Sequence, residues 1–218
     1  MGLLQGEHTM KTLIATAFIA TAAHGTGTLC TFENLPAPTT PSMSSATTGF
    51  YWDYLSSYEG FHFTSSSSQG NFQWAYYDLV GGGGYAGYDE GIIGDRALFT
   101  PWGSEQNKNY RIRRDDLWML NSIEVTSVWN STAVVIEGYR YGEGVFTYTT
   151  QLTAAQRVKL NISSGYPGPL NNITEIKIYT NTFSSHLAID NVNYTVLPAP
   201  SALALLAVAG ISTNRRRK

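Results

Sequence analysis

TAVVIEGYRYGEGVFTYTTQL, residues 132–152 of the chain, predicts a β-hairpin. The runs Thr132–Tyr141 and Val145–Leu152 are rich in β-branched and aromatic residues, which pack well on a pleated sheet. Between them lies the turn sequence Tyr-Gly-Glu-Gly, whose glycines supply the backbone conformations that a tight turn needs. Two neighbouring antiparallel strands are therefore expected here.

The residues after this hairpin alternate between apolar and polar side chains. Val158, Leu160 and Ile162 are interleaved with polar residues, and so are Ile176 and Ile178. Side chains of a strand point alternately to opposite faces, so each segment presents one apolar face and one solvated face. Further strand candidates are Thr31–Leu35, Phe50–Tyr54, Gly60–Phe63, Phe72–Tyr77, Arg96–Thr100, Leu120–Trp129 and His186–Val196.

No helical periodicity of useful length interrupts these strands between residues 31 and 196. Many short strands with frequent turns predict an all-β domain, an antiparallel β-sandwich of jelly-roll type, because two packed sheets close most of the strand edges. With 218 residues, the chain has room for one such domain at residues 31–196 and for two short end segments.

The composition narrows the class of partners. Between residues 24 and 200 there are 9 Lys plus Arg against 15 Asp plus Glu, a net charge of −6, and no basic stripe. Such a surface gives nucleic acid phosphates little to bind, so no nucleic acid partner is expected. The single cysteine, Cys30, cannot form an internal disulfide and is interpreted as a buried or incidental thiol.

The N-terminal segment has the three parts of a secretory signal peptide. Met10-Lys11 supplies a positive charge, an apolar run follows, and Ala20-Thr21-Ala22 is the small-residue pattern of a cleavage site. Residues 1–23 are therefore expected to form a signal peptide helix, with Met10 as an alternative start. A buried N-terminal strand or helix is the competing interpretation.

Residues 197–218 have the pattern of a second targeting signal. A Pro-x-Pro motif precedes a short apolar run, expected to be a hydrophobic helix, and a basic end; the residues concerned are Pro198, Ala199, Pro200, Arg215, Arg216, Arg217 and Lys218. Terminal cations stay on the cytoplasmic side by the positive-inside rule. A chain that carries both end signals would therefore have its body outside the membrane and its last residues inside.

This tail resembles the PEP-CTERM sorting signal of Gram-negative bacteria, although Ala199 stands where that family usually has Glu. The resemblance implies processing near the Pro-x-Pro motif by the membrane peptidase exosortase. It also implies transient insertion of the C-terminal helix in the inner membrane, and a final location in the cell envelope or outside the cell. A plain tail anchor is the alternative.

Patches of the body resemble the extracellular domains of the same family. Tyr58–Phe63, Gly87–Gly94 and Ala97–Phe99 follow their order of motifs, and Ala188–Val192 is similar to a closing strand that usually ends in Asp-Asn. The resemblance implies a jelly roll like those of carbohydrate-binding modules.

Two carboxylates suggest a structural calcium ion. Glu33 lies on the expected first strand and Asp190 on the last, and such strands can supply the hard oxygen ligands that calcium prefers. The apolar alternation changes phase at Asp190-Asn191, which predicts a β-bulge there. The alternative is that both acids cap turns or are exposed.

Aromatic residues are the candidates for sugar binding, because Tyr and Trp offer an apolar plate with a polar handle. The candidates are Trp52, Trp74, Tyr76, Trp102 and Tyr141. For any single one of them, filling of the core between the sheets is the competing interpretation.

No catalytic motif is found. Asp115 and Asp116 are adjacent, so in a strand they point to opposite faces, and no other local pattern pairs two carboxylates as a glycosidase requires. The preferred hypothesis is an exported, non-catalytic surface or matrix protein that binds extracellular polysaccharide. The alternatives are a secreted polysaccharide hydrolase on the same scaffold and a structural domain without a ligand.

Overall fold

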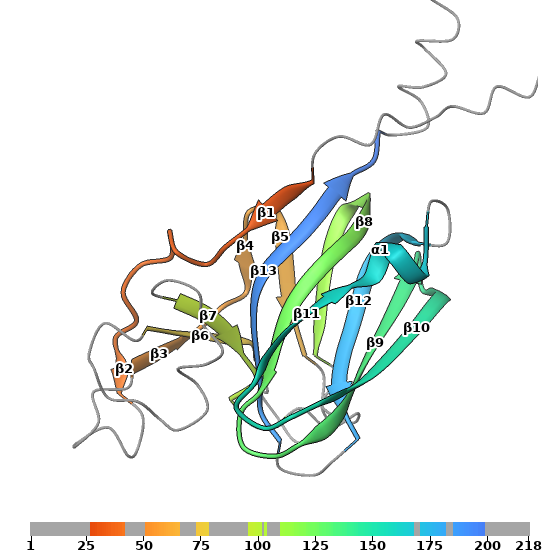
Figure 1. The fold of residues 1–218 in the computed structure, drawn as a ribbon. Helices are drawn as coiled ribbons and strands as arrows, with labels where there is room; N and C mark the ends of the chain where they lie inside the picture. Colours follow the sequence, from red (N-terminus) through yellow and green to blue (C-terminus); the bar gives the residue numbers. More distant parts are fainter. Residues whose placement is uncertain are drawn as a thin grey trace, which may run out of the picture.

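The computed structural model describes residues 27–41, 51–65, 73–78, 96–101, 103, 110–167, 171–181 and 185–198. These residues form thirteen strands and one short helix (Figure 1). The elements are β1 (Thr28–Cys30), β2 (Thr40–Pro41), β3 (Tyr51–Tyr54), β4 (Ser57–Tyr58), β5 (Phe61–Thr64), β6 (Ala75–Asp78), β7 (Arg96–Phe99), β8 (Arg111–Ser127), β9 (Thr132–Arg140), β10 (Glu143–Leu152), β11 (Arg157–Asn161), α1 (Ile162–Gly165), β12 (Asn172–Thr180) and β13 (Leu187–Val196).

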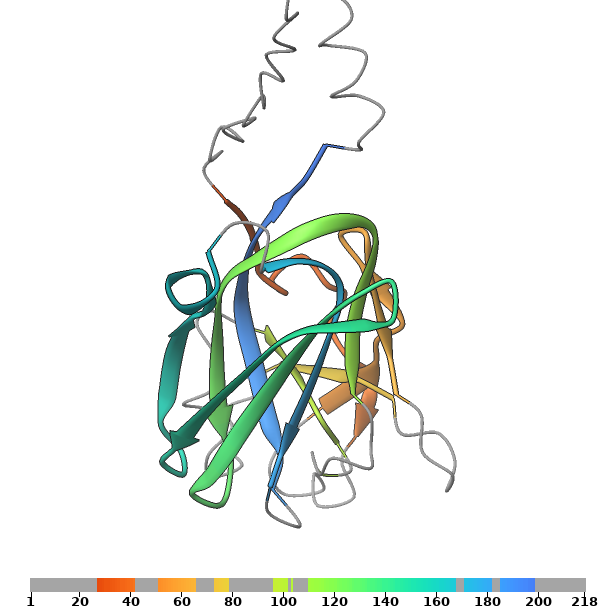
Figure 2. The same ribbon diagram turned by 90° about the vertical axis from the view of Figure 1, so that its right-hand side faces the viewer.

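The strands form two antiparallel layers that share β8 (Figure 2). Sheet I has the order β4-β5-β8-β12-β9-β10. Sheet II has the order β11-β8-β13-β7-β6-β3-β2, and β1 also pairs with β13. The predicted all-β fold, an antiparallel β-sandwich of jelly-roll type, is confirmed.

The strand β8 reaches both sheets because it bulges near its middle. In the ladder with β12, Glu175 pairs with Arg113 while Ile173 pairs with Trp118, so residues 114–117 of β8 have too few partners opposite them. An excess of residues in one strand bends it and increases its twist. The first part of β8 consequently pairs in sheet I, and the later part pairs with β13 and β11 in sheet II.

One large apolar core fills the space between the sheets. It takes inward side chains from both layers, for example Ile112, Ile136 and Ile176 from sheet I and Leu98 and Ile189 from sheet II, each no more than 1% exposed. Burial of an aliphatic side chain of this size contributes about 1.5–3 kcal/mol relative to an exposed one. The alternation that predicted the strands is therefore also what assembles the core.

The single cysteine lies in this core. Cys30 is 0% exposed, as expected for a buried thiol. Burial, followed by the nearby Glu59 carboxylate, raises the pKa of the Cys30 thiol far above its usual value. The thiol is therefore kept protonated, in the form that does not act as a nucleophile.

The predicted hairpin and bulge are both confirmed. The strands β9 and β10 pair from Arg140–Glu143 to Thr132–Leu152, with a register shift between Gly144 and Phe146. The ladder between β13 and β8 shifts between Asp190 and Asn193, and Asn191 adopts a positive φ of 48°. The change of alternation in the sequence thus marks a bulge in the last strand.

Some expected boundaries are wrong. Residues 31–35 form a turn after β1, since the Leu35 N–H donates to the Phe32 carbonyl at 3.2 Å and Arg96 donates to the carbonyls of Glu33 and Leu35. The strand expected at Leu120–Trp129 begins at Arg111 instead. The first residues of this strand are mostly charged and do not alternate with apolar residues, because the bulge interrupts the alternation of side chains between the two faces.

The two described ends of the chain lie at the same end of the sandwich (Figure 1). Thr28 of β1 pairs with Tyr194 of β13, two residues before the end of that strand. Among the described residues, no helix is both long and apolar enough to cross a membrane. The expected signal peptide at 1–23 and nearly all of the expected tail at 197–218 lie outside the described residues.

Candidate functional site

The outer face of sheet I gathers polar and aromatic side chains from five strands. In each strand the neighbouring residues point inward to the core, so these side chains point outward. We call this set the polar face, and it comprises His62, Arg111, Arg113, Glu137, Tyr139, Thr147, Glu175, Lys177 and Tyr179.

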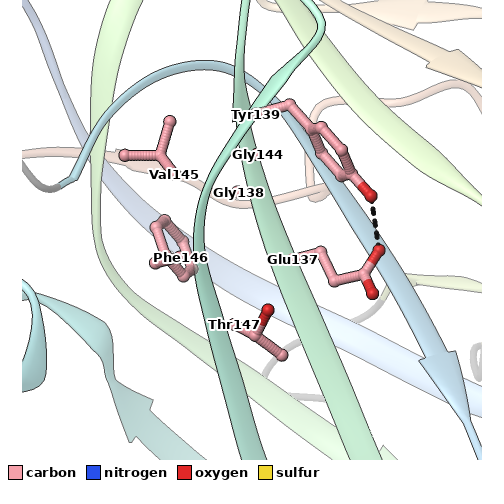
Figure 3. A pocket seen from close by; sticks show the side chains of 7 residues that line it. All are labelled: Glu137, Gly138, Tyr139, Gly144, Val145, Phe146 and Thr147. Carbon is pink, nitrogen blue, oxygen red and sulfur yellow. Dashed lines mark hydrogen bonds between the residues drawn. The ribbon is translucent and has the colours of Figure 1, made fainter.

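Glu137 is the centre of the polar face. Its Oε2 accepts a hydrogen bond from the Tyr139 hydroxyl at 2.6 Å (Figure 3), and its Oε1 accepts one from the Tyr179 hydroxyl at 2.8 Å. Burial, followed by the hydrogen bond to Glu137, raises the pKa of Tyr139 and of Tyr179 to about 12. Both phenols therefore stay protonated at neutral pH, and the two rings are held in place by one carboxylate.

Cations lie beside the same two rings. Arg111 is ion-paired with Glu175, and its Cζ is 5.7 Å from the centroid of the Tyr139 ring. Lys177 Nζ is 4.9 Å from the centroid of the Tyr179 ring. Cation–π attraction adds about 0.5–1 kcal/mol at partly exposed sites, so these contacts further fix the rings on the sheet.

A first hollow, the hairpin hollow, opens between β9 and β10 and encloses about 410 Å³. Its lining, labelled in Figure 3, is Glu137, Gly138, Tyr139, Gly144, Val145, Phe146 and Thr147. A Cβ on Gly138 would lie 2.1 Å from Phe146 Cε1, so glycine is needed there for the Phe146 ring to pack inward. The bulge between Gly144 and Phe146 widens the strand pair at this place.

A second hollow, the arginine hollow, lies where the bulge of β8 meets the β9–β10 turn and encloses about 330 Å³. Its lining is Arg111, Arg113, Arg114, Asp115, Tyr141, Gly142, Thr174 and Glu175. Glu175 in this hollow pairs directly with Tyr139 of the hairpin hollow, so the two hollows are neighbours on one face.

Tyr141 is the most exposed of those aromatic residues selected from the sequence that the structure describes. It is 71% exposed and has a positive φ of 50° in the β9–β10 turn. Its N–H donates to Thr174 Oγ1 at 3.0 Å, which ties the turn to β12. The structure thus presents Tyr141 at the rim of the arginine hollow, where its ring is open to a ligand.

The other selected aromatics do not join the polar face. Trp74 is 0% exposed and donates its Nε1–H to the Arg111 carbonyl at 3.0 Å, and Tyr76 is 4% exposed. The prediction that these two bind sugar is wrong, because core packing covers their rings. Trp52 is half-buried against Phe99 on the outer face of sheet II, and Trp102 lies outside the described residues.

Sequence reasoning missed the residues that form the centre of the polar face. Glu137, Tyr139 and Tyr179 were visible only as the polar half of two alternating strands. What was missing was the register, in which Lys177 pairs with Glu137 and Glu175 with Tyr139. This register brings the Tyr179 hydroxyl to the Glu137 carboxylate across the strands.

The suggested calcium ligands are only partly where they were expected. The strands β1 and β13 are neighbours, but Glu33 lies in the turn after β1. Asp190 is buried, and its Oδ1 accepts the Asn191 N–H at 2.7 Å within the bulge. No group of three or more His, Cys, Asp or Glu able to hold a metal ion occurs in the described part of the chain, and the calcium ion stays a prediction.

Only the first residue of the expected sorting motif is described. Pro198 is exposed and follows Leu197, whose N–H donates to the Leu117 carbonyl at 2.8 Å. The motif residues outside the described part are Ala199, Pro200, Arg215, Arg216, Arg217 and Lys218.

Comparisons with known proteins give similar folds only. No family model matches the sequence, and no curated protein matches it. Among solved structures, a DUF4465 family protein from Bacteroides caccae is 13% identical with a TM-score of 0.47, over 78% of this chain and 99% of that one. The CBM22-1 xylan-binding domain of Xyn10C from Paenibacillus barcinonensis is 12% identical with a TM-score of 0.38, over 79% and 97%.

A third similar structure is the family 11 carbohydrate-binding module of Lic26A-Cel5E from Clostridium thermocellum. It is 16% identical with a TM-score of 0.26, over 78% of this chain and 96% of that one. The strand pairing of the chain itself establishes the fold.

Proposed function

We propose that this domain binds polysaccharide through the polar face of sheet I and does not hydrolyse it. The observation that carries the proposal is the half-buried ring of Tyr139, which lines the hairpin hollow next to the arginine hollow and is held, together with the buried Tyr179, by the single carboxylate of Glu137. Binding sites for small polar ligands combine apolar plates with a few well-placed polar groups. A sugar ring offers apolar C–H faces and a rim of hydroxyl groups, so it matches both features.

The exposed ring of Tyr141 is the proposed first contact. It is the one residue of the selected aromatic set that is both fully described and more than half exposed. The backbone of Tyr141 is already held by its hydrogen bond to Thr174, so stacking of a sugar on this ring would cost little further conformational entropy.

Two carboxylates on the polar face require a comparison with hydrolases. Glu137 and Glu175 occupy diagonal positions on neighbouring strands, so their side chains are within reach of each other, as are the paired carboxyl groups of glycosidases. Such enzymes need one of the two groups to donate a proton. Here Glu137 accepts two phenolic hydrogen bonds and Glu175 accepts an arginine, so both act as acceptors and binding is the better supported function.

Affinity electrophoresis of the full chain in detergent tests the proposal. The gels would contain soluble xylan, mixed-linkage β-glucan or polygalacturonate, and parallel assays would measure newly formed reducing ends. We expect retardation by at least one polymer without reducing ends, and loss of retardation for Tyr139→Ala. Tyr51→Ala is the matched control, since Tyr51 is a 42% exposed tyrosine on β3 of sheet II.

Two outcomes would contradict the proposal. If none of the polymers retards the protein, the proposal that it binds polysaccharide is wrong. Reducing ends that disappear with Glu175→Gln would replace the binding module by a hydrolase.

We further propose, from the two end segments, that the chain is exported, inserted transiently in the inner membrane and processed by an exosortase. The support is the signal peptide pattern at 1–23, the tail at 197–218, and the position of both described ends at one end of the sandwich. Immunoblots of membrane and medium fractions test this in a host with and without exosortase. The proposal fails if the mass and location of the chain do not depend on the peptidase.

A further inference from the structure

The arginine hollow differs in charge from the rest of the chain. Its lining contains three guanidinium groups, from Arg111, Arg113 and Arg114, and two carboxylates, from Asp115 and Glu175. The hollow thus has an excess of one positive charge, whereas the whole chain has a formal net charge of −2. A concave cationic site in an acidic protein favours an anionic group over a neutral one.

Two of the three arginines are held by the protein itself. Arg111 is paired with Glu175. Arg114 Nη1 donates to the Glu59 carbonyl at 2.8 Å, and its Cζ lies 4.7 Å from the Phe61 ring centroid and 5.0 Å from that of Tyr194. The side chain of Arg114 is only 11% exposed, so these contacts fix it as part of the wall.

Arg113 is the arginine that a ligand can reach. Its side chain is 56% exposed, and its ion-pair partner Asp115 is 73% exposed at 3.3 Å. Exposed ion pairs of this kind contribute little stability, so a ligand carboxylate can take the place of Asp115. Asp115 would then keep a second partner, because His62 Nε2 lies 3.6 Å from its Oδ2.

The geometry of the rim suits a sugar acid. Tyr141 at the edge of the hollow offers a ring for stacking, and Arg113 within it offers a planar fork of donors that fits a carboxylate with two parallel hydrogen bonds. We infer that the arginine hollow selects polysaccharides that contain uronate residues, with Arg113 as the group that binds the uronate carboxylate. This inference rests on the proposed polysaccharide-binding function.

Polygalacturonate and its carboxyl-reduced form provide a matched pair of ligands that differ only in the charge of the sugar. Affinity electrophoresis of the full chain should give a dissociation constant about tenfold lower for the acidic polymer, as charge-assisted hydrogen bonds require. The difference should shrink as the salt concentration rises, because the contact is partly exposed.

Two variants should act in opposite directions. Arg113→Gln should abolish the preference for the acidic polymer, so that the acidic and the reduced polymer bind with the same dissociation constant. Asp115→Asn should strengthen binding of the acidic polymer severalfold, because the competing internal carboxylate is lost. Lys159→Gln is the control for net charge, since Lys159 is an exposed cation on β11 of sheet II, and it should change neither dissociation constant.

The outcomes separate this inference from the proposed function. Equal binding of the acidic and reduced polymers, unaffected by Arg113→Gln, would overturn uronate selection and leave polysaccharide binding intact. Dextran sulfate bound as tightly as polygalacturonate would contradict the assignment to carboxylates. No binding of any polymer would overturn both conclusions.

Discussion

The outer faces of the two sheets have opposite characters. On sheet I most side chains of the polar face are charged or phenolic, and several of them pair with one another within a strand or across neighbouring strands. On sheet II the outward side chains of β6 and β7, with Val128 and Ala188, form a second apolar cluster with exposures of 0–3%; its members are Ala75, Tyr77, Ala97, Phe99, Val128 and Ala188. The same alternating backbone thus offers a polar surface on one side of the molecule and a buried apolar surface on the other.

This difference shows that strand structure alone does not determine whether both faces of the strand are buried or one face is solvated. The strand β6 is buried on both faces at Ala75, Tyr76 and Tyr77, whereas β9 alternates between the core and the polar face. A strand in the middle of a covered sheet needs apolar residues on both sides. Only strands with one solvated face can therefore contribute polar side chains to a site.

The largest expected difference between the two outer faces is the loss of stability caused by an introduced charge. Ala97→Asp places a carboxylate at a position that is 0% exposed, and we expect a loss of about 3 kcal/mol or more in the free energy of unfolding, measured with urea. Thr149→Asp adds the same group to an exposed position on β10 of sheet I and should change stability by about 0.5 kcal/mol or less. Equal effects would show that the two faces do not differ as described.

A pair of glycines in the hairpin allows a finer test on sheet I alone. Gly138→Ala would force a Cβ to within 2.1 Å of the Phe146 ring, and overpacking of this kind costs about 1–3 kcal/mol. Gly144→Ala meets no atom within 4 Å, so its unfolding free energy should change by about 0.5 kcal/mol or less. If both variants unfold at the wild-type urea concentration, the Phe146 ring is not packed against Gly138.

Because the pKa values of Tyr139 and Tyr179 on the polar face are raised, we expect the free energy of unfolding to fall at high pH. Their pKa is raised to about 12 in the folded chain from an ordinary value of 10, so the stabilisation is complete below pH 10 and is lost between pH 10 and 12. Glu137→Gln should lower both folded pKa values, because it removes the carboxylate while burial remains. Tyrosinate absorbance followed against pH measures this, and unchanged titration midpoints would contradict the shared carboxylate.

The smallest effect on stability is expected at the rim. Tyr141→Ala removes a ring that is 71% exposed, so the free energy of unfolding should change by about 0.5 kcal/mol or less. Polysaccharide binding should nevertheless weaken about tenfold, because a stacking plate is lost. Tyr51→Ala, the matched variant on sheet II, should leave binding unchanged; equal losses would mean that exposed tyrosines bind without regard to the face.

Much of the fold was predictable from local patterns. The β9–β10 hairpin follows from two β-rich runs around a glycine turn, and the β13 bulge follows from the change of phase at Asp190-Asn191. The strands β11 and β12 follow from strict alternation. These features depend on residues a few positions apart, which is the range over which a period of two carries information.

The candidate site was much less predictable, because its residues meet only through long-range pairing. Of the aromatics chosen from the sequence, Trp74 and Tyr76 lie in the core while Tyr141 lies at the surface, and their types alone do not distinguish the two cases. The polar face also needs the exact register of β12 against β9 and β8.

The sequence by itself determined that the chain forms antiparallel strands, where most of them lie, and which of their faces are apolar. Only the tertiary structure decided that β8 serves both sheets, that the outward side chains of β6 and β7 in sheet II are buried, and that Glu137 meets Tyr179. The physical reason is that side-chain direction along a strand is set locally by the pleat. Which strands become neighbours is set by the packing of the whole core, where a shift of one residue would exchange the inner and outer faces.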